Sequence, residues 1–204
     1  MGVLGAGEVG RAVAGQAVRH GHEVVIGNSR GPDALRAVVS GLGTAVTEVG
    51  RAFGMRCIAW SQHLTPADAQ AKGVTYVARD ELFERSDVLS VHVVLSERTR
   101  GLVGARELGL MKPTAILVNT SRGPVVEEAA LIRALSEGGI ASAALDVFDR
   151  EPLPSDHPLR SLPNAVVTPH IGYVSRDLYE VFYRDAVEDI AAWRAGAPVR
   201  TLTG

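Results

Sequence analysis

The chain has 204 residues, of which 46% are hydrophobic and 22% are charged, a composition that indicates one globular domain and excludes a wholly disordered protein. Its 21 basic and 23 acidic residues give a formal net charge of −2, so the sequence has no net basic field for nucleic acid or an anionic membrane surface. No apolar run approaches the ~18 residues that a membrane span needs, and the lone cysteine, Cys57, cannot form an internal disulfide. We therefore expect a protein of the reducing cytoplasm, with Cys57 buried as a small hydrophobic residue.

Short apolar runs alternate with amphipathic or alanine-rich stretches along the chain. The apolar runs seldom alternate with polar residues, which is typical of parallel strands buried on both faces. Strands are expected at Val3–Leu4, Glu23–Ile26, Arg56–Trp60, Val88–Val91, Ala115–Asn119, Ser142–Val147 and Ala165–Thr168. Helices are expected at Val9–His20, Asp33–Gly54, Pro66–Lys72, Asp80–Arg85, Ala105–Leu110, Glu127–Gly138 and from about Ser175 to Trp193. This alternation predicts an α/β fold, a doubly wound parallel sheet of the Rossmann type.

A single dinucleotide-binding domain over residues 1–204 is the expected organisation. Residues 1–40 supply a first βαβ unit, residues 41–173 supply the remaining sheet and the catalytic loops, and residues 174–204 supply a C-terminal helix and tail. The C-terminal helix repeats apolar residues close to the helical period of ~3.6 residues and must bury that face. It either packs on its own sheet or forms the interface of a homodimer.

The segment Gly5-Ala6-Gly7-Glu8-Val9-Gly10 has the G-x-G-x-x-G pattern and lies between an apolar strand and an amphipathic helix. Gly5 makes the tight turn, Gly7 lets the backbone approach a pyrophosphate, and Gly10 lets the helix pack closely on the strand. Backbone N–H groups at the start of the helix, around Glu8 and Val9, then hold the phosphates. The pattern predicts a dinucleotide site, and we expect the strand before Gly5 to take the central position in the sheet.

The residues after the second expected strand bear on which nucleotide is bound. An Asp or Glu there accepts the ribose hydroxyls of NAD and repels the 2′-phosphate of NADP. This chain has Asn28, Ser29 and Arg30 instead, and a guanidinium can pair with a phosphate. We therefore expect NAD(P) as the cofactor, with NADP slightly favoured, although Arg30 could also be a solvated loop arginine.

Two parts of the sequence resemble two different protein families. Residues 2–40 resemble the opening βαβ unit of deazaflavin-dependent NADP oxidoreductases, in which the N-S-R turn takes the 2′-phosphate. From about Gly41 onward the chain resembles the nucleotide-binding domain and C-terminal helix of D-isomer-specific 2-hydroxyacid dehydrogenases. The passages that carry this second resemblance are 49–55 (VGRAFGM), 118–124 (VNTSRGP), 144–148 (ALDVF), and 151–152 (EP) through 168–172 (TPHIG).

Three ionisable side chains, Arg122, Glu151 and His170, each follow an expected strand. Because the carboxyl ends of parallel strands meet at one edge of a sheet, we expect these side chains to converge on one crevice. Reduction of a 2-keto acid needs a cation for the carboxylate and an acid that protonates the developing alkoxide. The resemblance implies that Arg122 binds the substrate, that His170 is the general acid/base, and that Glu151 orients the imidazole. It also implies that Asp146 holds the nicotinamide carboxamide, and Thr120 is a further cofactor-binding candidate in the same passages.

Each of the three residues also has a simpler interpretation. His170 could be a loop histidine, Glu151 a turn carboxylate before a proline, and Arg122 the first-turn residue of the following helix. Their order and spacing in the chain favour the functional interpretation. No His, Cys, Asp or Glu spacing suggests a metal site, so we expect none.

The sequence departs from the dehydrogenase pattern near its start. We expect the family's separate substrate-binding domain to be absent, and Gly41-Leu42-Gly43 resembles a truncated copy of the family's own glycine fingerprint. Two first βα units therefore compete for one position, and Arg56–Trp60 is either displaced outward or pairs as an alternative second strand. Ser61 and Gln62 follow that strand without an acid, so neither candidate position favours NAD over NADP.

The main functional hypothesis is an NAD(P)-dependent oxidoreductase that transfers a hydride between nicotinamide and a small 2-hydroxy or 2-keto acid. One alternative is a catalytically silent NAD(P)-binding module that has lost the closure over its substrate. The other is reduction of NADP by a deazaflavin, which residues 2–40 alone suggest.

Overall fold

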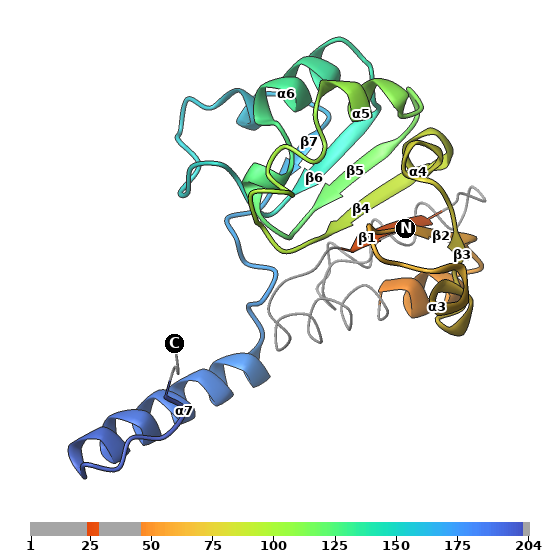
Figure 1. Ribbon diagram of the computed structural model, residues 1–204. Helices are drawn as coiled ribbons and strands as arrows, with labels where there is room; N and C mark the ends of the chain where they lie inside the picture. The colour runs from red at the N-terminus through yellow and green to blue at the C-terminus, as the bar shows by residue number, and fades with distance from the viewer. Residues whose placement is uncertain (1–23, 29–45, 202–204) are drawn as a thin grey trace. The chain divides into compact units, whose positions relative to one another are not determined.

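The computed structural model describes residues 24–28 and 46–201 of the chain, which fall into two compact units (Figure 1). The first unit ends at His170 and the second begins at Ile171. The expected strand at Val3–Leu4 and the expected helix at Val9–His20 lie outside the described residues.

The first unit is built on a seven-stranded sheet in the order β3-β2-β1-β4-β5-β6-β7, and every neighbouring pair is parallel. The strands are β1 (Val24–Asn28), β2 (Cys57–Trp60), β3 (Thr75–Tyr76), β4 (Val88–His92), β5 (Ile116–Asn119), β6 (Ser142–Leu145) and β7 (Ala165–Val167). From β1 the chain runs outward through β2 and β3, then returns to the other side of β1 with β4 and continues to β7. This is the predicted doubly wound α/β fold, with its change of direction between β1 and β4.

The central strand is not the one that the sequence predicted. Val24–Asn28 fills the position between the two halves of the sheet, where Val25 pairs with Ile58 of β2 on one side and with Leu89 of β4 on the other. The expectation that the strand before Gly5 takes this position was therefore wrong, and Cys57–Trp60 pairs as the second strand. The run Val24–Asn28 offers five residues for ladder hydrogen bonds, whereas the apolar lead-in before Gly5 is shorter.

Helices cover both faces of this sheet. Figure 1 shows α4, α5 and α6 on one side and α3 on the other. The described helices of the first unit are α3 (Pro66–Ala71), α4 (Arg79–Arg85), α5 (Ala105–Leu110) and α6 (Glu128–Ser136), with short 3₁₀ turns η1 (Gly123–Val125) and η2 (Pro158–Arg160). Residues 46–52 are also helical and lie within the range expected for the helix at Asp33–Gly54, of which residues 33–45 are outside the described residues. The four predicted helices of this unit that lie wholly within the described residues match α3, α4, α5 and α6 to within two residues at each end.

Local signals explain where some of these elements begin. Thr65 caps α3, because its hydroxyl accepts a hydrogen bond from the Asp68 N–H at 3.1 Å while the Asp68 carboxylate accepts one from the Thr65 hydroxyl at 2.6 Å. In α6, Ala130, Leu131 and Leu135 form the buried face. The prediction missed β3, whose two residues, Thr75 and Tyr76, are both exposed and are too few to stand out as a strand.

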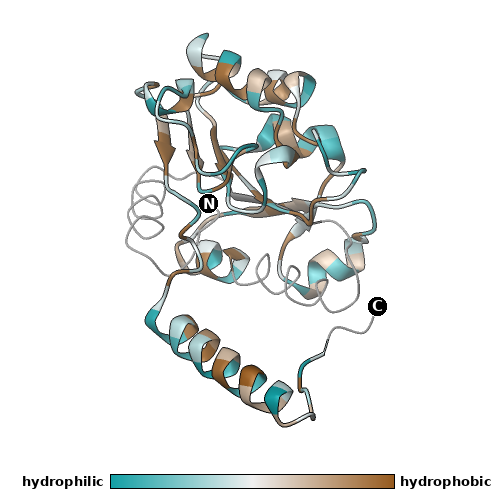
Figure 2. Cartoon of the chain, turned by 90° about the vertical axis from the view of Figure 1, so that its left-hand side faces the viewer, coloured by the Kyte–Doolittle hydropathy of each residue, from teal (hydrophilic) through white to brown (hydrophobic). Residues whose placement is uncertain are grey.

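The core lies between the sheet and its helices. Leu89 and Leu117 from the strands lie in one cluster with Leu82 and Leu131 from the helices and with Ile140 from the bend after α6, all with 2% or less of their surface exposed. Cys57 is buried with a free thiol, as predicted, and burial raises the pKa of that thiol. Figure 2 shows apolar colour on the strands and polar colour on the outward sides of the covering helices. None of the helices among the described residues is long and apolar enough to cross a membrane.

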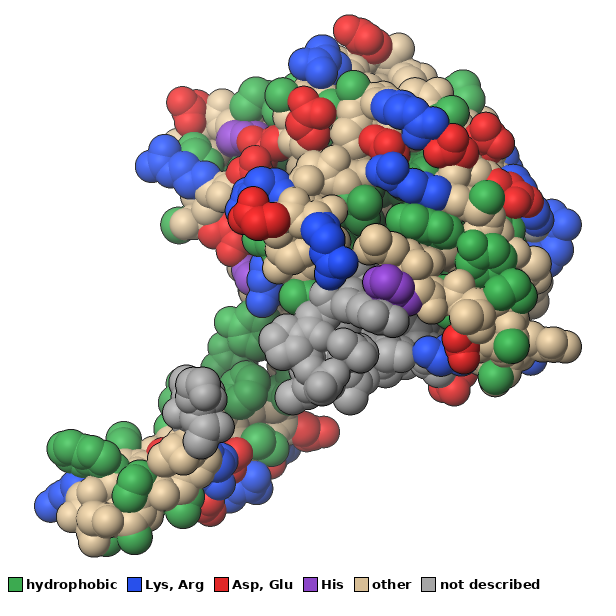
Figure 3. All heavy atoms as spheres, in the orientation of Figure 1, with side chains coloured by type: hydrophobic (Ala, Val, Ile, Leu, Met, Phe, Trp, Pro, Cys, Tyr) green, Lys and Arg blue, Asp and Glu red, His purple; other side chains and the backbone are tan. Residues whose placement is uncertain are grey.

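Acidic and basic side chains are mixed on the surface of the first unit. On the face shown in Figure 3 they lie side by side, with no broad area of one sign. Ion pairs such as Lys112 with Asp87, at 2.9 Å, account for part of this mixing. The distribution agrees with the formal net charge of −2 and offers no extended basic surface on that face.

The second unit consists mainly of one long helix, α7 (Arg176–Arg194), which was predicted from about Ser175 to Trp193. The Ser175 side chain caps it by accepting the Leu178 N–H at 3.3 Å. Within α7 no residue is buried, and its larger apolar side chains are exposed; these are Leu178, Tyr179, Val181, Phe182, Tyr183, Val187, Ile190 and Trp193. The amphipathic pattern is therefore present as predicted, and what covers this face stays a prediction.

Candidate active site

The loop after β5 carries Arg122 and is held rigidly by its neighbours. The buried Asn119 side chain accepts the Ser121 N–H at 3.0 Å and donates to the Arg122 carbonyl oxygen at 3.0 Å. The Ser121 hydroxyl donates to the carbonyl oxygen of Val91 at 2.6 Å and accepts the Val93 N–H at 3.1 Å, which fastens this loop to the end of β4. The Arg122 guanidinium is exposed and donates to the Ser121 carbonyl oxygen at 2.7 Å.

Gly123 brings this loop against the segment that follows β6. A Cβ atom at position 123 would lie 2.0 Å from the carbonyl carbon of Phe148 and 2.5 Å from the backbone nitrogen of Asp149. Only glycine leaves room for such an approach of two backbones. The contact places the Arg122 loop beside the segment that leads to Glu151.

Glu151 and His170 form a direct pair. One carboxylate oxygen of Glu151 lies 2.6 Å from His170 Nδ1, and the other accepts the backbone N–H of Phe148 at 2.9 Å. A carboxylate beside Nδ1 favours a proton on that nitrogen and orients the ring, so that Nε2 is the nitrogen for exchange with a substrate. The pair therefore has the arrangement that the resemblance implied for a general acid/base and its orienting carboxylate.

The neighbours of Glu151 change the pKa of its carboxyl group. Burial raises the pKa of the Glu151 carboxyl, but hydrogen bonds from His170 and Phe148 and the charges of His170 and Arg122 outweigh that effect. The net pKa of Glu151 lies below its ordinary value, so the carboxylate stays ionised. Arg122, Glu151 and His170 follow the neighbouring strands β5, β6 and β7 in the chain, and their common role in one site stays a prediction.

The backbone at His170 is strained. His170 has a φ of 54°, in the left-handed region that a side chain with a Cβ atom seldom adopts. Its N–H donates to the carbonyl oxygen of Thr168 at 3.0 Å, which closes a tight turn at the end of β7. Strain of this kind is concentrated at functional sites, where the surrounding structure holds it.

A hollow of about 590 Å³ opens beside the pair. Glu151 and His170 line it together with Phe148, Thr168 and Arg160. Such a space can admit a small organic acid next to the imidazole.

Asp146 follows β6 and is held by two contacts. The Thr168 hydroxyl donates to its carboxylate at 2.5 Å, and its backbone N–H donates to the Asn119 carbonyl oxygen at 3.0 Å. Asp146 is almost fully buried, and Thr120 is half-buried at the end of β5. Sequence reasoning missed Asn119, Ser121 and Thr168, although each stands at the carboxyl end of a strand beside a predicted site residue.

The glycine fingerprint and its neighbours are only partly described. Gly5, Gly7, Glu8, Val9, Gly10, Ser29 and Arg30 lie outside the described residues. Asn28 is the last residue of β1, opposite His92 of β4. Asn28 therefore ends the central strand, whereas the prediction had placed it after the second strand. The second strand of the sheet is β2, and its carboxyl end continues into Ser61 and Gln62.

A second, smaller cavity of about 60 Å³ lies by the carboxyl ends of β2 and β4. Its lining is mostly apolar and includes Trp60, Leu89 and Val91, with Gln62 and Arg98 as exposed polar members. Ring-sized apolar space with amide and guanidinium donors at its margin, beside the switch point of the sheet, fits part of a nicotinamide dinucleotide. We therefore take the residues present to be compatible with that cofactor.

His92, at the end of β4, has a structural partner that the sequence did not reveal. Its Nε2 lies 2.8 Å from the Ser90 hydroxyl, and burial lowers the pKa of His92 to about 4. The ring is therefore neutral near pH 7, which suits a packed core histidine. Among the described residues no group of three or more His, Cys, Asp or Glu side chains is placed to hold a metal ion.

The fold and the site together define a nucleotide-binding α/β protein with a histidine–carboxylate pair at the rim of its sheet. The family model described as "D-isomer specific 2-hydroxyacid dehydrogenase, NAD binding domain" matches residues 36–172. The chain therefore belongs to the D-isomer specific 2-hydroxyacid dehydrogenases and carries their NAD-binding domain. The match includes Gly41 and Gly43 and does not reach residues 2–35.

Individual relatives agree with this assignment. A glyoxylate reductase of Aeropyrum pernix is 44% identical over 155 residues, which are 76% of this chain and 46% of the relative. The solved phosphoglycerate oxidoreductase of Vibrio cholerae o395 has a TM-score of 0.76 and 34% identity, and the match covers 87% of this chain and 54% of that one. A D-isomer specific 2-hydroxyacid dehydrogenase of Xanthobacter autotrophicus Py2, solved with NADPH and MES, has a TM-score of 0.66 and 32% identity, covering 92% and 72%. The chain spans about half the length of the first two relatives.

Proposed function

We propose that the chain acts in an NAD(P)-dependent 2-hydroxyacid dehydrogenase, an enzyme that acts on CH–OH donors and interconverts a small 2-keto acid and its 2-hydroxy acid. The observation that carries the proposal is the 2.6 Å contact between His170 Nδ1 and Glu151 at the carboxyl end of the sheet. The relatives named glyoxylate reductase support glyoxylate, and close analogues such as hydroxypyruvate, as the first substrates to examine.

When bound, the nicotinamide supplies the hydride that reduces C2 of the keto acid, or accepts it in the reverse direction. His170 Nε2 gives a proton to the carbonyl oxygen as that oxygen gains negative charge, which balances the addition of hydride. Glu151 holds the imidazole by Nδ1 and stabilises the positive charge on the ring before the transfer. The Arg122 guanidinium pairs with the substrate carboxylate and polarises the carbonyl group.

Cofactor binding is assigned to residues at the other strand ends. Asp146, which the Thr168 hydroxyl orients, accepts a hydrogen bond from the nicotinamide carboxamide. Thr120 directly follows β5 and is the second residue assigned to the cofactor. The fingerprint Gly5, Gly7, Glu8, Val9 and Gly10 is proposed to hold the pyrophosphate through backbone N–H groups. These assignments rest on the sequence pattern and on the family.

NADP is the proposed preference, because neither the residues after β1 nor those after β2 include an acid that would repel a 2′-phosphate. Asn28, Ser29 and Arg30 are the candidates that the sequence offers for that phosphate. The resemblance of residues 2–40 to deazaflavin-dependent NADP oxidoreductases is a further proposal and favours the same nucleotide. A single dinucleotide-binding domain over residues 1–204, a cytoplasmic setting and a homodimer through the apolar face of α7 are likewise proposals.

The function is tested with the purified chain, by titrating NADPH and NADH and then following glyoxylate and hydroxypyruvate reduction through the loss of nicotinamide absorbance. We expect turnover that depends on Arg122 and His170. Nucleotide binding without turnover would mean an NAD(P)-binding module, and reduction of NADP by a reduced deazaflavin would favour the alternative enzyme. Failure to bind either nucleotide would contradict the proposal as a whole.

A further inference from the structure

The carboxyl end of β2 is the position that distinguishes NADP from NAD in a doubly wound sheet. The strand that follows the central strand in the chain and pairs with it ends next to the adenosine ribose. In this chain that strand is β2, because it pairs with β1 through Val25 and Ile58. Ser61 and Gln62 follow β2, whereas Arg30 follows the central strand by sequence.

The end of β2 has no acid that would oppose a phosphate. None of Ser61, Gln62 and His63 is an acid, and the next acid along the chain is Asp68. The Asp68 carboxylate already accepts the Thr65 hydroxyl at 2.6 Å in the cap of α3. The ribose hydroxyls of NAD therefore lack their usual carboxylate partner here.

Arg98 brings a guanidinium to the same place from the loop between β4 and α5. Its Nη1 donates to the Gln62 side-chain oxygen at 3.5 Å, and both side chains line the small cavity beside Trp60. A contact of that length is weak, so it costs little to exchange for a phosphate oxygen. Within the described part of the chain Arg98 makes no ion pair, since every salt bridge found there involves other residues.

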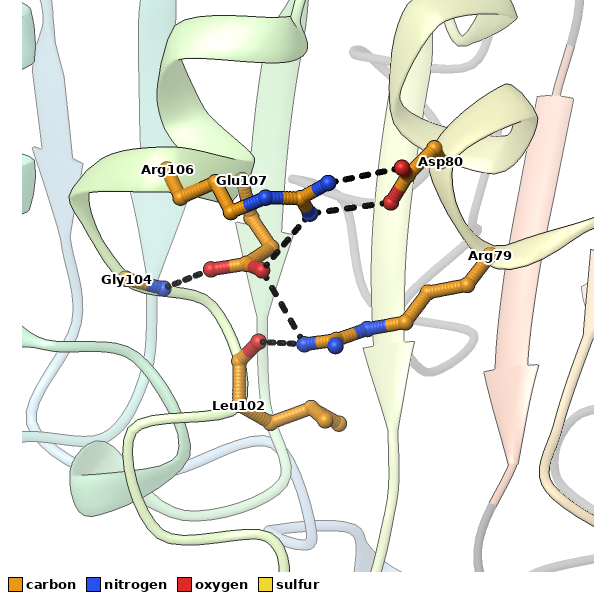
Figure 4. Close-up of polar contacts among 6 residues, drawn as sticks. All are labelled: Arg79, Asp80, Leu102, Gly104, Arg106 and Glu107. Carbon is orange, nitrogen blue, oxygen red and sulfur yellow. Dashed lines mark hydrogen bonds and ion pairs between the residues drawn. The ribbon is translucent and has the colours of Figure 1, made fainter.

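The neighbouring guanidinium of Arg79 provides a contrast. It lies over the Trp60 ring at 5.8 Å, but it is committed to the buried Glu107 carboxylate at 3.0 Å and to the Leu102 carbonyl oxygen at 3.2 Å (Figure 4). Figure 4 also shows Glu107 accepting the Gly104 N–H, at 3.1 Å, so this network fixes the end of the loop that carries Arg98. Arg79 therefore holds the loop in place and leaves the anion to Arg98.

The loop is closed close to Arg98 as well. The buried Thr99 hydroxyl donates to the Val94 carbonyl oxygen at 2.7 Å and accepts the Ser96 N–H at 2.8 Å. The Arg100 N–H donates to the Ser96 carbonyl oxygen at 2.9 Å. Arg98 thus projects from a turn whose backbone is already ordered, which lowers the entropy lost when a ligand binds.

We propose that Arg98, with Gln62, forms the subsite for the phosphate monoester on the adenosine ribose of NADPH, and that Arg98 is the residue that selects NADPH over NADH. This inference rests on the proposed function, because it requires the chain to bind a nicotinamide dinucleotide. It moves the selecting cation from Arg30, which the sequence pattern favoured, to a residue on another loop.

The test measures dissociation constants of NADPH and NADH by nucleotide fluorescence and by calorimetry, for the parent chain and for Arg98→Ala. Loss of a charge-assisted pair should weaken NADPH binding about 10- to 100-fold and change NADH binding by less than about twofold. Arg100→Ala is the matched control, because Arg100 is an exposed arginine on the same loop that does not line the cavity. Gln62→Asp should reverse the preference, since a carboxylate there accepts ribose hydroxyls and repels the phosphate.

The outcomes separate this inference from the proposed function. If the parent binds neither nucleotide, the proposed function fails. If the parent binds NADPH and Arg98→Ala binds it equally well, while Arg30→Ala loses that affinity, the selecting cation is Arg30 and the inference is overturned. Equal weakening of NADPH and NADH by Arg98→Ala would also overturn it, because the residue would then act on a part that both nucleotides share.

Discussion

Two histidine–carboxylate pairs lie in the same stretch of the chain, and they differ in what the imidazole can still do. His157 lies 3.0 Å from Glu128 through Nε2, and its Nδ1 accepts the Leu159 N–H at 3.3 Å. His170 lies 2.6 Å from Glu151 through Nδ1 and lines the larger hollow. Their side chains are 15% and 38% exposed, respectively.

The contrast shows that a carboxylate beside a histidine does not by itself make a catalytic pair. Because Nδ1 of His157 accepts a backbone N–H, its proton must lie on Nε2, where it is donated to Glu128. Both ring nitrogens of His157 therefore serve the 3₁₀ turn η2 and the start of α6. His170 instead lines a space where a small acid fits, and its backbone has the left-handed conformation that is concentrated at functional sites.

The largest expected effect comes from comparing two single variants, one that lacks the imidazole of His170 and one that lacks the imidazole of His157. His170→Ala should lower kcat/KM for glyoxylate reduction by about 10²- to 10⁴-fold, the usual contribution of a general acid. His157→Ala should lower the free energy of unfolding by about 1–3 kcal/mol through its lost hydrogen bonds, with little change in kcat/KM. Steady-state kinetics and urea denaturation check both, and the reverse pattern would show that we have assigned the wrong pair.

The next largest effect is expected from Arg122, the proposed partner of the substrate carboxylate. Arg122→Ala should lower kcat/KM by about 10²- to 10³-fold, because a preorganised donor to the substrate is lost. Arg122→Lys should recover only part of this, since an ammonium cannot pair with a carboxylate in two places. A full recovery by lysine would contradict the bidentate contact and leave only a general charge effect.

A smaller effect is expected at Gly123, where the loop that carries Arg122 meets the segment after β6. Gly123→Ala forces a Cβ atom against the backbone of Phe148, which should cost about 1–3 kcal/mol of folding stability. The Arg122 loop should then move away from Glu151 and turnover should fall with it. Gly109→Ala is the control, because a Cβ at that helical position meets nothing within 4 Å. Equal stability of the two variants would argue against the close approach at Gly123.

The smallest effect is a pH dependence. The folded-state pKa of Glu151 lies below its ordinary value of 4.5, so its carboxylate stabilises the fold above the unfolded-state pKa. That stabilisation is lost as the pH falls through the lower, folded-state pKa. Glu151→Gln should therefore lose less unfolding free energy than the parent on acidification from neutral pH, as measured by urea denaturation at each pH. Parallel losses would contradict the lowered pKa of Glu151 in the folded state.

Much of the sheet could be predicted from the sequence, because buried parallel strands are continuous apolar runs. The strands β4, β5 and β7 match such runs to within a residue at each end, and Arg122, Glu151 and His170 could be placed because each follows a run. Strand order could not be predicted, since it depends on long-range pairing, and two candidate first units competed for the central position. The fastening contacts of Asn119, Ser121 and Thr168 were also missed, because a hydrogen bond across neighbouring strand ends leaves no periodic pattern.

The most direct measurement follows the hydride itself. The chain is incubated with glyoxylate and NADPH deuterated at the transferable position of the nicotinamide, and the glycolate formed is analysed by mass spectrometry. Transfer at the proposed site predicts glycolate with deuterium on C2 from the parent and from His157→Ala, and formation of that product about 10²- to 10⁴-fold more slowly from His170→Ala. Saturating NADPH binding without labelled glycolate from the parent, or undiminished labelling by His170→Ala, would contradict the assignment of the site.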